Sequence, residues 1–510
     1  MKFNIKISSS LISAMILLST GCSKFEDINT NPDATEKVNA SLLATNIILK
    51  NLKFNGRDAK AYLDENAQSK YIALANESMI RSQYNDLGAA GFDNMTMLPN
   101  IESMLKYAEG STMENSYKAL AKFSRAYMFY DISMKVGDIP YSKTGGGQTG
   151  VTKVPFDTQE QVMTGILDDL KEAAALFASG IKFDGDPTPY NGDPAKWRRA
   201  TNAFALRVLL SLSKKSEAST INIKNRFQEI VTENFLLENN TGYLGLKYSS
   251  LNLHPMAGTN DLFTSRTDVS KTIIDNLKLL NNDRRLFYYA DPSKAKIASG
   301  LNEANPNAYV GVDVSDSYDD ITTAHLSNTY SLINSRYLKV VDSDPRMMMT
   351  YAEQQFILSE ARLLNWISTG NAKDYYESGV KAALTDIMNT NSSYAHGMAI
   401  NQSYIDGYFT GEAAFKSTTS EQLKQIWLQK YLMNFMVNPI QSFYEYRRTG
   451  YPTFPINPAT SLNITNKNAI PVRWLYPSSE YNYNKDNLIS ALNSQYSGID
   501  DINNKMWLLK

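Results

Sequence analysis

Residues 349–366 read MTYAEQQFILSEARLLNW, and this stretch indicates the fold class of the chain. Apolar and small residues recur at steps of 4, 3, 4 and 3 along one face, at Ala352, Phe356, Ser359, Leu363 and Trp366. That spacing is typical of one side of an α-helix. A second face carries Ile357, Ala361 and Leu364. A helix that is apolar on two faces packs between two layers, so we expect neighbours on both sides.

A partner helix is predicted directly after this one. Gly370 ends the first helix, and small or apolar residues then recur on one face, at Ala372, Tyr376, Gly379, Ala383 and Ile387. Small side chains on that face allow two helices to approach closely. Antiparallel helix pairs of this length suggest a short helical-repeat scaffold, although no repeat of about 34 residues is visible in the sequence.

Further helices are predicted from capping and stop signals. A continuous apolar face predicts a helix over residues 114–136. A capping box of Thr158 and Gln161 predicts a helix to about Phe177, and Asp193-Pro194 predicts the start of another. Thr419 and Gln422 cap a further helix, which Asn438-Pro439 ends. Weaker patterns predict helices from near Ala40 and over residues 59–80. The helical faces include Trp197, Trp366 and Trp427, which we assign to the core. The chain is therefore predicted to be mostly α.

Three stretches lack a helical period. Residues 81–100 are predicted to form a loop that presents polar and aromatic groups, and the tail from Ser442 is irregular and rich in tyrosine. Residues 238–346 form the longest such stretch, in which only residues 270–280 are convincingly helical. A long irregular segment inside a compact protein usually has a function. We therefore predict a single helical domain over residues 40–510 with a loop-rich insertion at about 238–346.

The N-terminus carries a secretion signal that ends at Cys22, the single cysteine of the 510 residues. A short cationic start is followed by a small-and-apolar run over residues 7–18 and by small residues directly before the cysteine, the pattern of a signal peptide. The sequence predicts a signal peptide over residues 1–21, a lipidated Cys22 and a tether over residues 22–39. The alternative is ordinary secretion with an incidental cysteine.

Bulk composition excludes several classes of protein. Lys and Arg number 51 against 52 Asp and Glu, a net charge of −1, which offers no basic footprint for nucleic acid. Without Cys22 the body has no cysteine, so no disulfide framework is available. The sequence contains neither H-E-x-x-H nor G-x-S-x-G. Residues 145–150 match G-x-G-x-x-G, but no strand precedes them, so a flexible loop is the better interpretation.

Seven stretches, in order along nearly the whole chain, resemble the SusD/RagB family of outer-membrane lipoproteins from Bacteroidetes. They are FEDINTNP (residues 25–32), GDIPY (137–141), GDPAKW (192–197), TYAEQQFILSEA (350–361), YEYRRTGYP (444–452), PVRWLYP (471–477) and YNYN (481–484). Residues 350–361 are the most specific of these. The resemblance implies a mostly α, tetratricopeptide-like helix-pair scaffold whose long irregular insertions carry the binding surface. In the helix over residues 350–361, Glu353 and Glu360 are interpreted as structural polar partners.

The resemblance also implies a function and a location. Proteins of this family are lipid-anchored in the outer membrane, face the cell exterior, and capture glycans or peptides as a lid on a SusC-like TonB-dependent barrel. The expectation for this chain is a non-enzymatic nutrient-binding lipoprotein without a cofactor. The alternatives are a lipoprotein glycoside hydrolase, which needs paired carboxylates, and a structural subunit of the transporter that binds no ligand.

Candidate ligand-binding residues are taken from the irregular stretches, because rigid scaffolds commonly present binding groups on loops. The first loop supplies Gln83, Tyr84, Phe92 and Asn94, and the insertion supplies His254, Asn260, Tyr309, Tyr318 and Tyr330. Aromatic faces pack on sugar C–H groups, and amides and carboxylates bind hydroxyl groups. His254, His325 and His396 are separated in sequence, and each is interpreted first as a structural or surface histidine.

No metal is expected, although one acidic run is a weak calcium candidate. Calcium prefers several carboxylate and carbonyl oxygens. The insertion contains such groups at Asp313, Asp316, Asp319 and Asp320. Their spacing fits no EF-hand loop, so a solvated acidic loop is the better interpretation.

Overall fold

The computed structural model of the protein describes residues 39–510, apart from residues 55–58, 146–149, 151–152, 258–262 and 343. Cys22, the predicted signal peptide and Asn260 therefore lie outside the described residues, as do most of the predicted tether and of the G-x-G-x-x-G stretch. No helix within the described ranges is both long enough and apolar enough to cross a membrane.

Three long helices form one layer in the first half of the chain. α6 (Glu114–Val136), α7 (Gln159–Ala178) and α8 (Pro194–Ser211) pack side by side in sequence order. Thr158 accepts a hydrogen bond from the Gln161 amide in the predicted capping box. The Asp193 side chain caps α8 in the same way. These starts are confirmed, because each cap satisfies amide groups that a helix leaves unpaired.

A second group of helices continues this layer. α15 (Tyr351–Leu363) and α16 (Ala372–Met388) are the predicted pair, and α15 also packs against α18 (Thr419–Met433) and α8. α15 thus has neighbours on both sides, as its two apolar faces predicted. A Cβ atom on Gly379 would lie 2.6 Å from the Phe356 ring, so a glycine is needed where α15 and α16 approach.

Buried ion pairs connect these helices. Arg207 on α8 donates from Nε to Glu353 Oε1 on α15 over 2.7 Å, and both side chains are almost fully buried. Arg448 on α19 (Pro439–Thr449) donates to Glu360 over 2.6 Å. The interpretation of Glu353 and Glu360 as structural partners is confirmed. Trp197 and Trp366 are buried in the core, and Trp427 packs against it half-buried.

The N-terminal helices differ from the sequence prediction in one place. α3 (Ala40–Leu52) begins where predicted, and α5 (Leu98–Ala108) packs on it. The predicted helix over residues 59–80 is too long. α4 (Ala59–Gln68) ends before Lys70, which has a left-handed φ of 59°, and β1 (Ile72–Leu74) follows. β1 is set by its pairing with a distant strand, which no local period reveals.

The insertion over residues 238–346 contains more regular structure than predicted. Besides the predicted helix α10 (Lys271–Leu279), it holds α11 (Leu286–Tyr289), α12 (Lys294–Ala298), α13 (Tyr318–Leu326), α14 (Arg336–Lys339), β4 (Leu244–Leu246) and β5 (Thr267–Val269). β1 pairs with β5, and β4 pairs with β6 (Arg346–Met349). These elements are too short for a period to be detected, and they are held by long-range contacts.

The C-terminal region is also more regular than predicted. The tail from Ser442 is not irregular, because it includes most of α19 and the later helices α20 (Ser478–Tyr483) and α21 (Lys485–Tyr496). Pro439 occupies the first position of α19 and starts a helix there. The N-cap of α18 is Thr418, which accepts from the Glu421 amide, one residue before the predicted cap. The other α-helices and strands of the described residues are α9 (Ile223–Glu233), α17 (Gln402–Asp406), β2 (Ile139–Pro140) and β3 (Phe156–Asp157), and short 3-10 helices lie between several elements.

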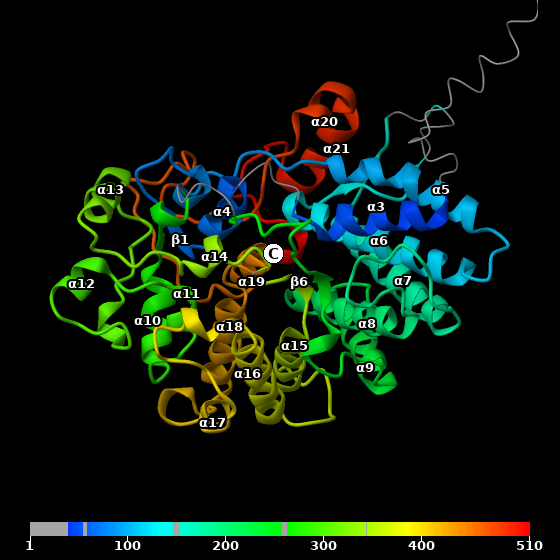
Figure 1. The fold of residues 1–510 in the computed structure, drawn as a ribbon. Helices are drawn as coiled ribbons and strands as arrows, with labels where there is room; N and C mark the ends of the chain where they lie inside the picture. The colour runs from blue at the N-terminus through cyan, green and yellow to red at the C-terminus, as the bar shows by residue number, and fades with distance from the viewer. Residues whose placement is uncertain (1–38, 55–58, 146–149, 151–152, 258–262, 343) are drawn as a thin grey trace, which may run out of the picture.

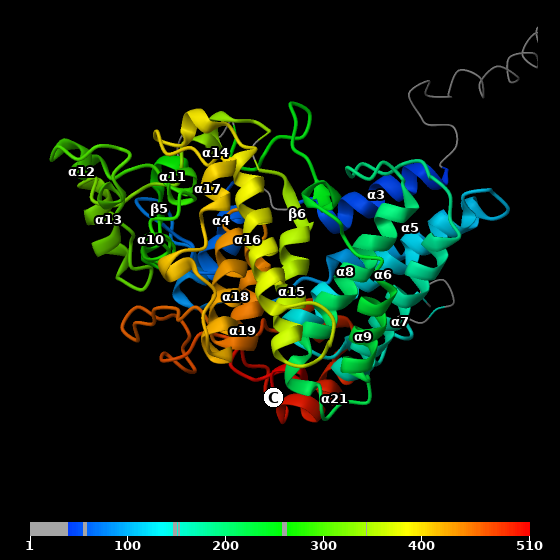
Figure 2. The same ribbon diagram turned by 90° about the horizontal axis from the view of Figure 1, so that it is seen from below.

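The elements divide into three regions across the molecule. In Figure 1, α3 and α5–α9 lie on one side, the green helices α10–α13 lie on the other, and α15–α19 stand between them. Figure 2 shows the same order after a turn of 90°. β6 lies near the junction in both views. Almost all buried apolar side chains of the described residues belong to one continuous core.

Candidate functional site

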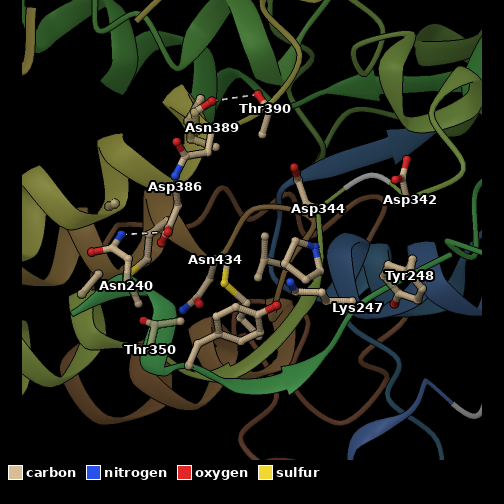
Figure 3. A pocket seen from close by; sticks show the side chains of 18 of the residues that line it. Asn240, Lys247, Tyr248, Asp342, Asp344, Thr350, Asp386, Asn389, Thr390 and Asn434 are labelled. Atoms are coloured by element: carbon tan, nitrogen blue, oxygen red, sulfur yellow. Dashed lines mark hydrogen bonds between the residues drawn. The ribbon is translucent and has the colours of Figure 1, made fainter. Parts of the chain in front are cut away.

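A cavity of about 690 Å³ lies where the ends of the central helices meet the insertion. Its walls come from the start of α15, the ends of α16 and α18, strand β6 and the insertion residues around 240–248 and 336–345. Figure 3 shows Asn240 and Asp386 on one side of the cavity and Lys247 and Tyr248 on the other. Ligand pockets in proteins typically enclose about 300–1,000 Å³, so this cavity has the size of a binding site.

The fold positions the lining residues through helix ends and one strand. Thr350 is the N-cap of α15, Asn389 follows the last residue of α16, and Asn434 follows the last residue of α18. Met347 on β6 lines this cavity, whereas its neighbours Arg346 and Met348 line a different one. This alternation follows from the two-residue period of a strand. The helix ends therefore bring amide and hydroxyl side chains together at one place.

Two acidic groups in the cavity have distinct electrostatic settings. Asn240 donates from Nδ2 to Asp386 Oδ1 over 2.8 Å and to the Ala382 carbonyl over 2.7 Å. Burial raises the pKa of Asp386 to about 7. Asp344 accepts two hydrogen bonds from Arg336, of 2.6 and 2.7 Å. Burial alone would raise the pKa of Asp344, but the Arg336 guanidinium lowers it below its ordinary value.

The other lining groups combine apolar surface with polar tips. Four tyrosines line the cavity, Tyr243, Tyr248, Tyr289 and Tyr394, together with apolar side chains such as Ile387, Met433 and Val437. Lys247, Asp342 and Asn389 are exposed at the cavity, while Tyr289 and Asn434 are buried. Aromatic faces can pack on sugar C–H groups, and amides can bind hydroxyl groups. The arrangement can therefore hold a carbohydrate or another polar ligand without covalent chemistry.

Most of these lining residues could not be identified from the sequence. Asn240, Lys247 and Asp344 lie in the insertion over residues 238–346, but no local pattern distinguishes them from its other polar residues. Asp386 and Asn434 lie at helix ends, and no periodic signal distinguishes them. The nearest sequence signal is the polar run Asn389-Thr390-Asn391 directly after a predicted helix.

The eight sequence candidates within the described residues are not brought together in one site. His254 is buried behind the cavity wall, where its ring meets Tyr248 edge-on with 4.9 Å between centroids. Its Nδ1 accepts from the Met256 amide, and burial lowers its pKa to about 4. Tyr309 is fully buried and donates to the Glu303 carbonyl over 2.9 Å. Both side chains are therefore packed inside the protein and are not exposed to a ligand.

Four candidates do meet, where the first loop contacts the insertion. Gln83 donates to the Val314 carbonyl over 3.3 Å, and Tyr84 donates to the Asp316 carbonyl over 3.2 Å. Tyr318 hydrogen-bonds the Glu77 backbone. Tyr330 packs against a small apolar cluster whose members are Ala73, Ala75, Val312, Val314 and Ile321. The expectation that this loop presents Gln83 and Tyr84 is wrong, because both are buried by the insertion. Tyr318 and Tyr330 are half-buried.

The last two loop candidates lie elsewhere. Phe92 is buried with its ring edge-on to Tyr476, so it is not presented either. Asn94 is half-buried and lines the smaller polar cavity beyond β6. A binding role for the candidates within the described ranges stays a prediction.

The acidic run does not assemble a metal site. Within the described ranges, no three His, Cys, Asp or Glu side chains are grouped to hold a metal ion. Asp313 accepts from the Ser315 amide and hydroxyl, and Asp320 accepts from the Ser317 hydroxyl. Two histidines have carboxylate partners: His325 with Asp268 at 3.1 Å, and His396 with Asp291 and Glu303 at 3.0 Å. Both histidines therefore have carboxylate partners within the fold, and their structural role stays a prediction.

Comparison with known proteins identifies the class of the chain. A SusD-like family described as "Starch-binding associating with outer membrane" matches residues 32–477. A solved SusD homologue from Bacteroides fragilis is 37% identical, with a TM-score of 0.88 over 93% of this chain and 100% of its own. A Bacteroides vulgatus structure described as a "putative outer membrane protein, probably involved in nutrient binding" is 30% identical, with a TM-score of 0.83 over 93% of this chain and 100% of its own. No curated protein matches.

This chain belongs to the SusD-like family of nutrient-binding proteins that associate with the outer membrane. The predicted family is thereby confirmed, as is the mostly α, tetratricopeptide-like helix-pair fold. A chitin-binding SusD homologue from Flavobacterium johnsoniae shares the fold at 20% identity, with a TM-score of 0.71 over 92% of this chain and 98% of its own. The family is described by the binding of starch and not by a reaction.

Proposed function

We propose that this protein captures oligosaccharides at the outer surface of the outer membrane and delivers them to a partner TonB-dependent transporter. The observation that carries the proposal is the 690 Å³ cavity, which joins tyrosine faces to amide and hydroxyl side chains. Family membership supports the outer-membrane setting and the capture of nutrients. Peptides are the other ligand class that such a cavity could accept.

The ligand class follows from the chemistry of the lining. The family description names starch, and one structural relative is described as chitin-binding. Both polymers are built from glucose-type rings, which present C–H faces and several hydroxyl groups. Exposed Lys247 and Asn389 at the cavity suit hydroxyl groups, and the tyrosines suit the ring faces.

The proposed anchor is Cys22, lipidated after removal of residues 1–21. Each buried methylene of an acyl chain contributes about 0.8 kcal/mol to membrane binding, so several chains hold a protein stably. The tether over residues 22–39 then joins the lipid to α3. In this arrangement the protein is held beside its transporter and faces the cell exterior.

One observation favours a second candidate, a glycoside hydrolase. The cavity contains a carboxyl group with a pKa of about 7, Asp386, and an ionised carboxylate, Asp344, and such enzymes pair an acid with a carboxylate. However, both oxygens of Asp344 accept hydrogen bonds from Arg336. A carboxylate held in this way is poorly placed to attack a sugar or activate water, so capture without turnover is the better proposal.

The proposal is tested by extracting the full-length protein from its own membrane in mild detergent and identifying co-purifying proteins and small ligands. Capture predicts a TonB-dependent barrel and a bound glycan. Recovery of neither would contradict it, and a barrel without ligand would favour a structural subunit. Chitohexaose and maltoheptaose are then added to the purified protein. Saturable binding without shortened products supports capture, whereas shortened products would establish the hydrolase.

A further inference from the structure

A second cavity, of about 400 Å³, lies on the other side of strand β6. Its walls come from α3, α4, α6, α8, the start of α19 and the outer face of β6. Arg346 and Met348 point to this cavity, while Met347 between them lines the first one. The two cavities are therefore separated by a single strand, and they share no lining residue.

The second cavity is lined by the buried guanidinium of Arg346, which has few polar partners. Arg346 is 9% exposed, and within the described part of the chain its Nε and Nη1 have no hydrogen-bond partner. Its nearest carboxylate is Glu65, whose Oε2 lies 3.9 Å from Nη2, beyond hydrogen-bond distance. That Glu65 oxygen is itself buried and has no hydrogen bond to any described residue. The other Arg on this wall, Arg207, is fully paired with Glu353.

Three amide side chains around the same cavity are also unsatisfied. Gln68 Nε2, Asn51 Oδ1 and Asn438 Oδ1 are buried without a hydrogen-bond partner among the described residues. Gln68 and Asn438 are 4% and 2% exposed. A buried polar atom without a partner costs about 1–3 kcal/mol, and native proteins keep few of them. Their concentration around one cavity indicates that something polar occupies it.

The unsatisfied atoms define the chemistry of that occupant. Three are donors, on Arg346 and Gln68, and three are acceptors, on Glu65, Asn51 and Asn438. The seventh is the hydroxyl of Tyr130, which can both donate and accept. A simple anion would meet the Glu65 carboxylate, and a simple cation would meet the Arg346 guanidinium. A hydroxyl group both donates and accepts, so a molecule with several hydroxyl groups can satisfy both kinds of atom. Trp474, Tyr127 and Phe54 add aromatic surface.

We propose that this cavity is a second binding site, for one neutral, polyhydroxylated ring of the size of a monosaccharide. The site is independent of the proposed capture of oligosaccharides in the first cavity. It accepts a single ring because its volume is about 400 Å³ against 690 Å³ for the first cavity. Arg346 and Glu65 bind adjacent hydroxyl groups, and the amides of Gln68, Asn51 and Asn438 bind the others.

The test titrates the full-length purified protein with four probes, monitored by ligand-observed NMR and calorimetry. The probes are D-glucose, N-acetylglucosamine, glycine and acetate. We expect saturable binding of at least one sugar, and at least tenfold weaker binding of glycine and acetate. Arg346→Met should weaken the sugar at least tenfold, and Gln68→Leu should weaken it several-fold. Preference for glycine or acetate, or the absence of saturable sugar binding, would overturn the proposal.

Two further measurements separate this site from the first cavity and from simple hydration. Asp386→Asn alters the first cavity. If Asp386→Asn weakens sugar binding and Arg346→Met does not, the sugar binds in the first cavity and the proposal is overturned. If Arg346→Met fails to fold, a crystal of the unaltered protein soaked in the sugar decides the question. We expect density for a ring against Arg346 and Gln68. Separate water molecules alone would reject the site. If the unaltered protein binds a monosaccharide but does not bind chitohexaose, only the proposed capture of oligosaccharides is refuted.

Discussion

The helix-pair body and the insertion over residues 238–346 are stabilised in different ways. In the body, long capped helices pack over whole faces, and buried ion pairs such as Arg207–Glu353 connect one helix to the next. In the insertion, short strands and helices depend on single hydrogen bonds to distant segments, as between Val269 N and Ser331 O or Tyr318 and Glu77. The body should therefore be sensitive to changes in packing over whole helix faces and at the ion pairs between helices. The insertion should be sensitive to the loss of individual long-range hydrogen bonds and of its own buried ion pair between Arg336 and Asp344.

The largest effect is expected at the Arg207–Glu353 pair. Arg207→Met leaves the Glu353 carboxylate buried, where its side chain is only 2% exposed. Removing one partner of a buried ion pair typically costs about 3–5 kcal/mol. We expect a loss of that size in the free energy of unfolding, measured by urea denaturation. The matched control is Lys171→Met, which removes an exposed pair with Glu229 and should cost less than about 0.5 kcal/mol. Equal losses for the two variants would contradict the account.

A smaller effect is expected where α15 and α16 approach. In Gly379→Ala the new methyl would lie 2.6 Å from the Phe356 ring. Overpacking of this kind costs about 1–3 kcal/mol, against a gain of up to about 1 kcal/mol in helix propensity. Gly407→Ala is the control, because its nearest atom would be 3.4 Å away. A thermal melt in which Gly379→Ala is as stable as Gly407→Ala would show that the helices do not approach so closely.

In the insertion, Tyr318→Phe tests the dependence on single hydrogen bonds. It removes the hydroxyl that pairs with the Glu77 backbone, and such a bond contributes about 0.5–1.5 kcal/mol. Tyr107→Phe removes a hydroxyl from a side chain that is 54% exposed, and it should change stability by less than about 0.5 kcal/mol. Denaturant midpoints of the two variants make the comparison. No difference between them would mean that the insertion does not rely on this contact.

The last effect concerns the pH dependence of stability and the half-buried Asp386. Burial raises its pKa to about 7, above the value of about 3.9 expected in the unfolded chain. Between these two values the folded state binds more protons, so this group lowers stability as pH rises from about 4 to 7. Asp386→Asn removes that dependence. We expect the free energy of unfolding of the variant, minus that of the parent protein, to be larger at pH 8 than at pH 4. A stability difference that is independent of pH would exclude the raised pKa.

The same contrast explains what the sequence could predict of the fold. The period of residues 349–366, the Thr158 capping box and the Asp193-Pro194 start are local signals, and they located α15, α7 and α8. β1 and β5 are three residues each and owe their conformation to each other, so neither was predicted. The same is true of α13, whose Tyr318 finds its partner 241 residues earlier in the chain. Long-range pairing leaves little trace in a local pattern.

For the candidate site, the sequence located the region but not the residues. The insertion does supply one wall of the larger cavity, with Asn240, Lys247 and Asp344. The sequence predicts Gln83, Tyr84 and Tyr309 to be loop groups open to a ligand, yet tertiary packing buries all three. Asp386 and Asn389 lie at the end of a predicted helix, and they become lining residues only because three helix ends converge. Burial and convergence are properties of the folded chain.

We propose that the nutrient is held where the helix-pair body meets the insertion. The most direct measurement is a calorimetric titration of chitohexaose and maltoheptaose into the purified protein and four variants. Asn389→Ala alters the helical wall and Lys247→Ala alters the insertion wall. Each should weaken binding of the preferred oligosaccharide about fivefold, the equivalent of one hydrogen bond at about 1 kcal/mol. Tyr318→Ala and Tyr330→Ala should leave it within twofold. Unchanged binding for the first two variants, with loss for the tyrosine variants, would place the ligand near Tyr318 and Tyr330 and contradict this placement.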